Sequence, residues 1–290
     1  MRQAAVITNS GVVYCPTRRS AITETIQCWN VPSWTHSALR TPNFPKAKNS
    51  DDPIAVIATL SGEGFYHFLL ESLPRLSFLR QAGIPSGVKI VANGKSGSFA
   101  EAWLHDAGVE PSIILWADDL FHLHAPDVYF TSYLMRDRGP DAWTIQTLRS
   151  MFPTPAPSSA TQEKWLWISR ADSSKRQPLW EKQFLREFPK FECVHLSSCS
   201  PAEQRLLFRS ACRIAGPHGA GFSNLVFCSA GARVLEIFPL DLHMPLYQRL
   251  AHASGLFHSE LVADFDSTSL SSALIYSICH WLDSSVPATK

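Results

Sequence analysis

The chain has 290 residues, of which 45% are hydrophobic and 18% charged, and its formal net charge is +1. This length favours two domains, because single hydrophobic cores stop growing near about 250–300 residues, and the balanced charge excludes a dedicated nucleic-acid-binding protein. The seven cysteines form no C-x-x-C pair, so we predict no metal site. The N-terminus lacks the pattern of a signal peptide, and we expect a cytoplasmic protein or one trimmed of its anchor.

The first half of the chain alternates apolar strands with helices. The predicted strands span 51–60 and 87–93, and the predicted helices span 64–83, 98–109 and 141–152. Such alternation is typical of a mainly parallel sheet. Three prolines then separate small residues just after position 152, and they exclude a helix or a central strand. We therefore predict a first lobe over 1–152 and a proline-rich linker over 153–160.

The second half reads as a series of βαβ units. Its predicted strands span 164–170, 191–196, 213–216 and 233–238, and its predicted helices span 179–188, 200–211 and 221–231. The helix that starts near Ser200 has a strong start signal, because Pro201 occupies the first helical position and Glu203 completes a capping box. Folds of this kind bind ligands outside the carboxyl ends of their strands. We predict a second lobe over 161–270.

A glycine-rich turn, Gly216-Pro-His-Gly-Ala-Gly221, joins a predicted strand to a predicted helix. Unpaired backbone N–H groups from Gly219 to Phe222 would lie at the start of that helix, where a phosphate is stabilised by hydrogen bonds and by the helix dipole. The turn matches neither G-x-G-x-x-G nor G-x-x-x-x-G-K-[ST]. Taken alone, it is equally well explained as a tight connection.

Several segments together resemble glycosyltransferase family 61. The most specific is His218-Gly-Ala-Gly-Phe-Ser-Asn224 with Glu236 downstream, and the others are 168–170, Arg176 with Glu181, 200–211 and 66–75. The resemblance implies a GT-B fold, in which two Rossmann-like lobes flank a cleft. It also implies a nucleotide-sugar co-substrate in the second lobe and inverting transfer without an obligatory metal or cofactor. In this architecture the C-terminal stretch 271–290 would form a helix that crosses back to the first lobe. Where the family often has asparagine, this chain has Trp180, which leaves the identity of the donor open.

The resemblance assigns donor binding to residues at the end of the strand 164–170 and just after it, in the glycine-rich turn and the helix start that follows, and on the strand 233–238. They are Arg170, Arg176, His218, Gly219, Ala220, Gly221, Asn224 and Glu236. Arginines suit a diphosphate, and a histidine can stabilise the leaving group. Glu236 closes a strand, where its carboxylate can accept the hydroxyls of a ribose. The alternatives are solvated loop cations, a structural histidine, a strand-end ion pair and, for Asn224, a simple helix cap.

Three residues of the first lobe share one face of the predicted helix 64–83, because His67, Glu71 and Arg75 are spaced four apart. An inverting transfer needs a base that takes the proton of the acceptor hydroxyl, and a histidine backed by a carboxylate suits that role. We predict His67 as the base with Glu71 orienting it. Glu71 as the base, or an ordinary ion pair between Glu71 and Arg75, are the alternatives.

We therefore expect a hexosyl- or pentosyltransferase that uses a nucleotide sugar, with UDP-sugars favoured, and a glycan, polysaccharide or glycolipid acceptor. A non-catalytic nucleotide-sugar or glycan-binding protein of the same fold is the alternative. Asp264 and Asp266 have the spacing of a metal-diphosphate motif, but we expect a solvated turn there. We expect no nucleic-acid partner. Peripheral membrane association through 271–282 is left open, although that stretch has no basic face to support it.

Overall fold

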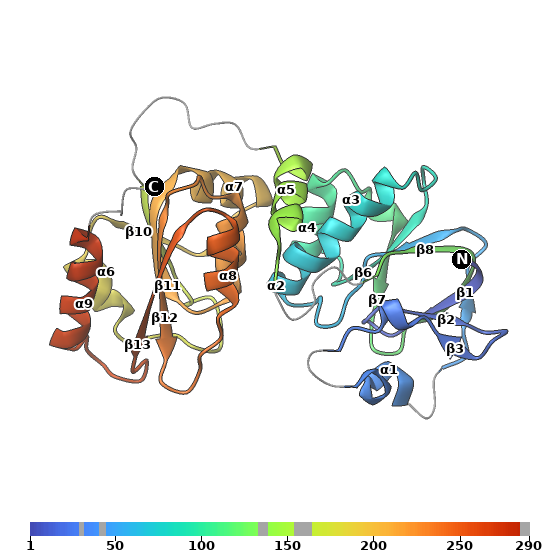
Figure 1. The fold of residues 1–290 in the computed structure, drawn as a ribbon, viewed down its shortest axis with the longest axis horizontal. Helices are drawn as coiled ribbons and strands as arrows, with labels where there is room; N and C mark the ends of the chain where they lie inside the picture. The colour runs from blue at the N-terminus through green and yellow to red at the C-terminus, as the bar shows by residue number, and fades with distance from the viewer. Residues whose placement is uncertain (29–31, 41–44, 133–138, 154–163, 285–290) are drawn as a thin grey trace. The chain divides into compact units, whose positions relative to one another are not determined.

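The computed structural model describes residues 1–28, 32–40, 45–132, 139–153 and 164–284. It divides the chain into two compact units, Met1–Phe152 and Pro153–Lys290, each built around its own β-sheet (Figure 1). Apart from Pro153, the predicted linker lies outside the described residues. Each unit combines strands and helices, so both are of the α/β class.

The first unit has an eight-stranded mixed sheet in the order β3-β2-β1-β8-β5-β6-β7, with β4 also paired to β8. β5 lies parallel to both β6 and β8, whereas β1 runs antiparallel to β8 and to β2. The strands are β1 (Arg2–Ile7), β2 (Val12–Cys15), β3 (Ser20–Ala21), β4 (Lys48–Asn49), β5 (Ile54–Val56), β6 (Lys89–Asn93), β7 (Ile114–Ala117) and β8 (His122–Phe130). The prediction of a parallel sheet was correct for β5 and β6 but missed the antiparallel half.

Apart from the short α1, the helices of the first unit follow strands of the parallel half. They are α1 (Ser37–Arg40), α2 (Phe65–His67), α3 (Leu73–Gln81), α4 (Phe99–Asp106) and α5 (Ala142–Met151), with short 3-10 turns at Thr23–Thr25, Ser33–Thr35 and Pro111–Ile113. Figure 1 shows α3, α4 and α5 grouped together beside the parallel strands. Asp141 caps α5 by accepting a hydrogen bond from the backbone N–H of Thr144 at 2.9 Å.

The predicted helix 64–83 is not a single α-helix. A π-helical turn, η3 (Phe68–Ser72), joins α2 to α3. Pro74, the second residue of α3, has no N–H to donate to the carbonyl of Leu70, so regular α-helical pairing cannot continue through this point. Single π-turns inside helices occur frequently at functional sites, and this one contains Glu71.

The second unit has a five-stranded, fully parallel sheet in the order β10-β9-β11-β12-β13. Its elements are β9 (Lys164–Ile168), α6 (Glu181–Glu187), β10 (Phe191–Val194), a 3-10 turn at Leu196–Ser198, α7 (Pro201–Ser210), β11 (Ala211–Pro217), the 3-10 helix η6 (Ala220–Phe227), β12 (Arg233–Pro239), α8 (Leu246–Ala253), β13 (Phe257–Ala263) and α9 (Ser272–Asp283). The predicted capping box of α7 is present. The sequence missed α8 and β13.

Helices cover both faces of this second sheet, which makes the unit Rossmann-like (Figure 1). α6 and α9 cover one face, where Phe184 and Trp281 join a core cluster that includes Leu235 and Ile237 of β12. The helices α7, η6 and α8 lie on the other face. Because side chains alternate along a strand, Glu236 of β12 projects to the α8 side.

The C-terminal helix requires a correction. We expected 271–290 to cross back to the first lobe, but the described part, α9, buries Leu274, Ile278 and Trp281 in the core of the second unit. Its apolar side is thus used within its own unit. Within the part of the chain that the structure describes, no helix is both long and apolar enough to cross a membrane.

Candidate active site

In the first unit, polar side chains gather beyond the carboxyl ends of β5 and β6. Glu71 is buried, with 2% of its side chain exposed, and its Oε1 lies 2.9 Å from Nδ1 of His67. Its other oxygen accepts a hydrogen bond from the side-chain amide of Gln27 at 2.6 Å and lies 3.1 Å from the hydroxyl of Thr59. The carboxylate is therefore held from both sides.

Arg75 supplies a buried positive charge beside this carboxylate. Its guanidinium donates to the carbonyl of Ala58 at 2.9 Å and to the hydroxyl of Thr59 at 3.2 Å, so Thr59 connects Arg75 to Glu71. Burial lowers the pKa of Arg75 to about 10, although the negative charge of Glu71 opposes this shift. At neutral pH the arginine stays charged, and it compensates a carboxylate that would otherwise be costly to bury.

His67 and Glu71 differ in what they can reach. The side chain of His67 is 24% exposed, whereas that of Glu71 is 2% exposed. Because a carboxylate only accepts hydrogen bonds, Nδ1 of His67 carries the proton between them, and the neutral ring then has its lone pair on Nε2. This arrangement suits His67 as the general base and Glu71 as the residue that orients it. The reverse assignment fits less well, because Glu71 is almost fully buried.

Sequence reasoning did not identify Gln27 and Thr59. Thr59 follows the apolar run of β5, and a polar residue at that end of a parallel strand is a recognisable signal. Gln27 lies 44 residues before Glu71, outside any predicted element, and nothing in the sequence pairs them.

In the second unit, two arginines lie close together after β9. Arg170 donates from Nε to the carbonyl of Lys175 at 3.1 Å and from Nη2 to the hydroxyl of Ser173 at 2.7 Å. Burial lowers the pKa of Arg170 and the positive charge of Arg176 lowers it further, whereas Tyr247 and the carboxylate of Asp172 oppose the shift. Within the described ranges neither arginine forms an ion pair with a carboxylate. Two neighbouring cations without a paired counter-ion favour the binding of an anion.

A small cavity of about 70 Å³ adjoins Arg170 at the carboxyl ends of β9 and β11. Its lining includes Ser169, Arg170, Gly219, Gly221 and Phe222. The glycine-rich turn and the first of the two arginines, which sequence analysis assigned to one site, thus line the same cavity. Parallel α/β sheets bind their ligands at this edge.

The glycines of the turn are needed for space. An added Cβ would lie 2.7 Å from the carbonyl oxygen of Ile168 at Gly216, 1.9 Å from Nη1 of Arg170 at Gly219, and 2.7 Å from Cδ1 of Leu196 at Gly221. None of the three has a positive φ angle. The turn therefore brings Arg170 against the backbone at Gly219, directly before η6 begins.

Glu181 and Trp180 have roles inside the unit. The carboxylate of Glu181 accepts hydrogen bonds from Trp167 at 2.7 Å and from the hydroxyl of Ser169 at 2.8 Å, and so fixes the residue before Arg170. Trp180 is 1% exposed and donates to the carbonyl of Asp264 at 2.9 Å. Trp180 is therefore a core residue.

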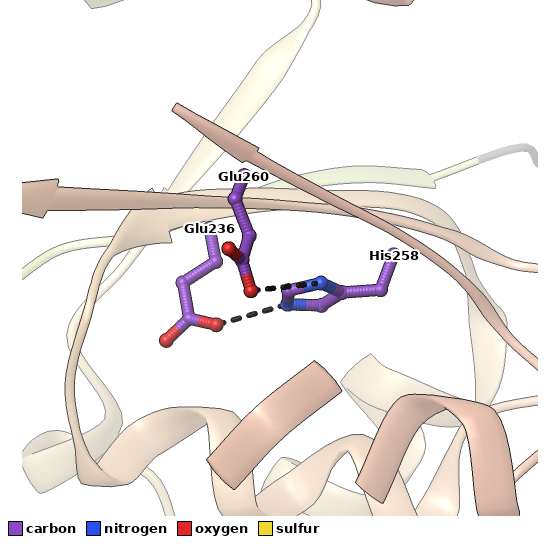
Figure 2. A group of neighbouring side chains, drawn as sticks. All are labelled: Glu236, His258 and Glu260. Atoms are coloured by element: carbon purple, nitrogen blue, oxygen red, sulfur yellow. Dashed lines mark hydrogen bonds and ion pairs between the residues drawn. The ribbon is translucent and has the colours of Figure 1, made fainter. Parts of the chain in front are cut away.

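His218 and Glu236 form a buried pair. Nδ1 of His218 is hydrogen-bonded to Oε1 of Glu236, and the ring stacks on Phe238 with centroids 4.8 Å apart. The carboxylate of Glu236 is fully buried, and its second oxygen is 2.9 Å from Nε2 of His258 (Figure 2). Both oxygens of Glu236 thus hold imidazoles, which conflicts with the predicted contact to a ribose.

Three further residues considered in the sequence have structural contacts. Asn224 is fully buried and donates to the side chain of Gln204 at 3.0 Å and to the carbonyl of Gly221 at 3.3 Å, so it ties η6 to α7. Asp264 and Asp266 are exposed, and the Asp264 carboxylate accepts from the backbone N–H of Asp266 at 3.0 Å. This is the solvated turn that we expected.

A larger hollow of about 670 Å³ lies in the first unit, where its lining includes Lys48, Asp52, Lys89 and His122. Lys89 and His122 begin β6 and β8, and Asp52 precedes β5. These are the amino ends of parallel strands, opposite the edge that carries Thr59 and Asn93. None of the predicted catalytic or donor-binding residues contributes to its lining.

Comparison with known proteins identifies the family. No curated protein matches the chain. The model of the family described as "Glycosyltransferase 61" matches residues 65–235. This span covers more than half of the chain and runs from α2 to β12, so that it includes His67, Glu71, both arginines and the glycine-rich turn. The chain therefore belongs to glycosyltransferase family 61.

Proposed function

We propose that this protein is an inverting, metal-independent glycosyltransferase of GT-B architecture that moves a sugar from a nucleotide sugar to an acceptor hydroxyl. The observation that carries the proposal is the pair of arginines that form no ion pair with a described carboxylate, of which Arg170 lines the cavity of the glycine-rich turn. Family membership supports sugar transfer in general. The donor, the inversion and the acceptor class are our inference.

In this proposal the second unit holds the nucleotide diphosphate. Arg170 and Arg176 donate charge-assisted hydrogen bonds to the phosphate oxygens, and the backbone from Gly219 to Gly221 approaches them closely. His218, when protonated on both nitrogens, donates from Nε2 to the departing diphosphate. Glu236 balances that imidazolium and fixes its orientation. We therefore assign Glu236 a positioning role in place of ribose binding.

The first unit supplies the base. Nε2 of His67 takes the proton of the acceptor hydroxyl while the oxygen attacks the anomeric carbon of the donor. The bond between that carbon and the diphosphate oxygen breaks, and its electron pair leaves with the diphosphate. Glu71 holds the tautomer of His67 and stabilises the resulting imidazolium. We favour a UDP-sugar as donor and a glycan, polysaccharide or glycolipid as acceptor.

The test is a calorimetric and thermal-shift screen of the purified protein against UDP, GDP, CMP and ADP, each with and without EDTA, followed by the matching nucleotide sugars. We expect one nucleoside diphosphate to bind selectively and to raise the melting temperature, because a ligand that binds only the folded state stabilises it. Binding should survive EDTA. If none of the four binds, the donor assignment is wrong; if one binds but its sugar is never transferred or hydrolysed, the protein is a binding protein of this fold.

A further inference from the structure

β13 carries a histidine and a glutamate that the proposed reaction does not use. His258 and Glu260 lie two residues apart, so they project to the same face of the sheet, next to Glu236 of β12 (Figure 2). One oxygen of each glutamate and one ring nitrogen of His258 lie within 4.8 Å of one another. Because a carboxylate can only accept, Nε2 of His258, which is 2.9 Å from Glu236, carries a proton.

That proton leaves the other side of the neutral ring as an acceptor. Nδ1 of His258 and Oε1 of Glu260 are both buried, and no described residue forms a hydrogen bond with either atom. They lie 3.7 Å apart, which is too long for a hydrogen bond. The side chain of His258 is only 5% exposed. Two buried lone pairs thus face each other without a direct hydrogen bond.

We propose that a Zn²⁺ ion binds between His258 and Glu260. Ligand bonds of about 2.0–2.2 Å at tetrahedral angles place a nitrogen and an oxygen ligand about 3.4 Å apart, close to the separation found here. The hydrogen bond from His258 to Glu236 matches the carboxylate–histidine pairing that orients zinc-binding histidines. The positive ion also compensates two neighbouring carboxylates.

His243 lies on the solvent side of the proposed site and holds Glu260. Its Nε2 is 2.9 Å from the second oxygen of Glu260, so this nitrogen carries a proton and is not a ligand here, and its side chain is 60% exposed, which gives an ion a path of entry. Imidazole ligands favour Zn²⁺ over Mg²⁺, which prefers oxygen ligands and keeps its waters. The competing arrangement has no metal: a doubly protonated His258 bridges Glu236 and Glu260.

Zinc binding can be measured without nucleotide, so the result does not depend on the proposed transferase activity. The full chain is treated with a chelator, freed from it by dialysis and titrated with Zn²⁺ by calorimetry, with the bound ion counted by elemental analysis. We expect one Zn²⁺ per chain, a higher melting temperature with Zn²⁺, and no such rise with Mg²⁺.

Variants distinguish this site from surface binding. Glu260→Gln, in a side chain that is 25% exposed, should weaken Zn²⁺ binding at least tenfold without unfolding the protein, and His243→Gln should weaken it as well. The matched controls are His252→Gln, an exposed histidine of α8, and Asp264→Asn, and both should bind as the wild type does. Absence of stoichiometric Zn²⁺ in the wild type, or unchanged binding in Glu260→Gln, would overturn the proposal.

Discussion

Glu71 is buried and Arg170 is half-buried, and their charges are balanced differently. Glu71 lies near a buried arginine, accepts hydrogen bonds and holds His67 in place. Arg170 has a second cation nearby and forms no ion pair with a described carboxylate. A balanced carboxylate suits the orientation of a base, whereas two neighbouring cations that form no ion pair with a described carboxylate suit the binding of an anion.

The first residue-scale prediction concerns this cation pair. Arg170→Ala should weaken the binding of the matching nucleoside diphosphate about 10- to 100-fold, since a hydrogen bond from a charged group contributes about 1.5–3 kcal/mol. The affinity of the unphosphorylated nucleoside should not change. Calorimetry measures both, with the exposed Arg186→Ala as the control. Equal affinities of Arg170→Ala and the wild type for the diphosphate would refute the diphosphate assignment.

The second residue-scale prediction concerns the base. Glu71→Gln retains the side-chain shape but removes the charge that orients His67, so the rate of sugar transfer should fall by about 10²- to 10⁴-fold. Donor affinity should stay at the wild-type value. Steady-state kinetics and donor binding measured on the same samples separate these effects, and the exposed Glu110→Gln serves as the control. Retained transfer in Glu71→Gln would show that the base lies elsewhere.

At the scale of elements, neighbouring atoms leave no room for side chains at the glycines that connect β11 to η6. Gly216 faces the backbone oxygen of Ile168 in the neighbouring strand, which cannot move without disturbing the sheet, whereas Gly219 faces the movable end of Arg170. The same substitution should therefore have different effects at these two glycines.

We expect Gly216→Ala to lower the free energy of unfolding by about 1–3 kcal/mol, because an added methyl group must displace packed backbone. Gly219→Ala should lower stability less, since Arg170 can turn aside, but should weaken nucleoside diphosphate binding. Urea unfolding followed by tryptophan fluorescence measures the first effect, and calorimetry measures the second. Equal loss of stability in both variants would contradict this explanation.

For the whole molecule, the sequence predicts elements that local signals define and misses those that distant partners define. The capping box of α7 and the parallel strands β9 to β12 have such signals. β1 pairs with β8 about 120 residues away, for example Ala4 with Ala125, and no local pattern indicates that pairing. The antiparallel half of the first sheet was missed for this reason.

The candidate site shows the same limit. His67 and Glu71 could be paired from their spacing alone, because both lie on one helical segment. His218 and Glu236 were each predicted, but their contact depends on the pairing of β11 with β12, and so the ribose-binding role was assigned to a carboxylate that is already occupied. Glu260 lies on β13, which was not predicted, so its position beside Glu236 could not be predicted either.

The π-helical turn at Phe68–Ser72 has a consequence for how this segment tolerates insertions and deletions. Removal of one of its residues would tighten the turn, but His67 would keep nearly its rotation relative to Arg75, because a π-helical turn absorbs one extra residue between two α-helical segments. Arg75 is anchored to Ala58 and Glu71 lies inside the turn, so the deletion would instead move Glu71 relative to both His67 and Arg75. The length of this apolar segment, and not only its composition, therefore matters for activity, and a sequence one residue shorter here would disturb the contact of Glu71 with His67 although it retained every polar side chain.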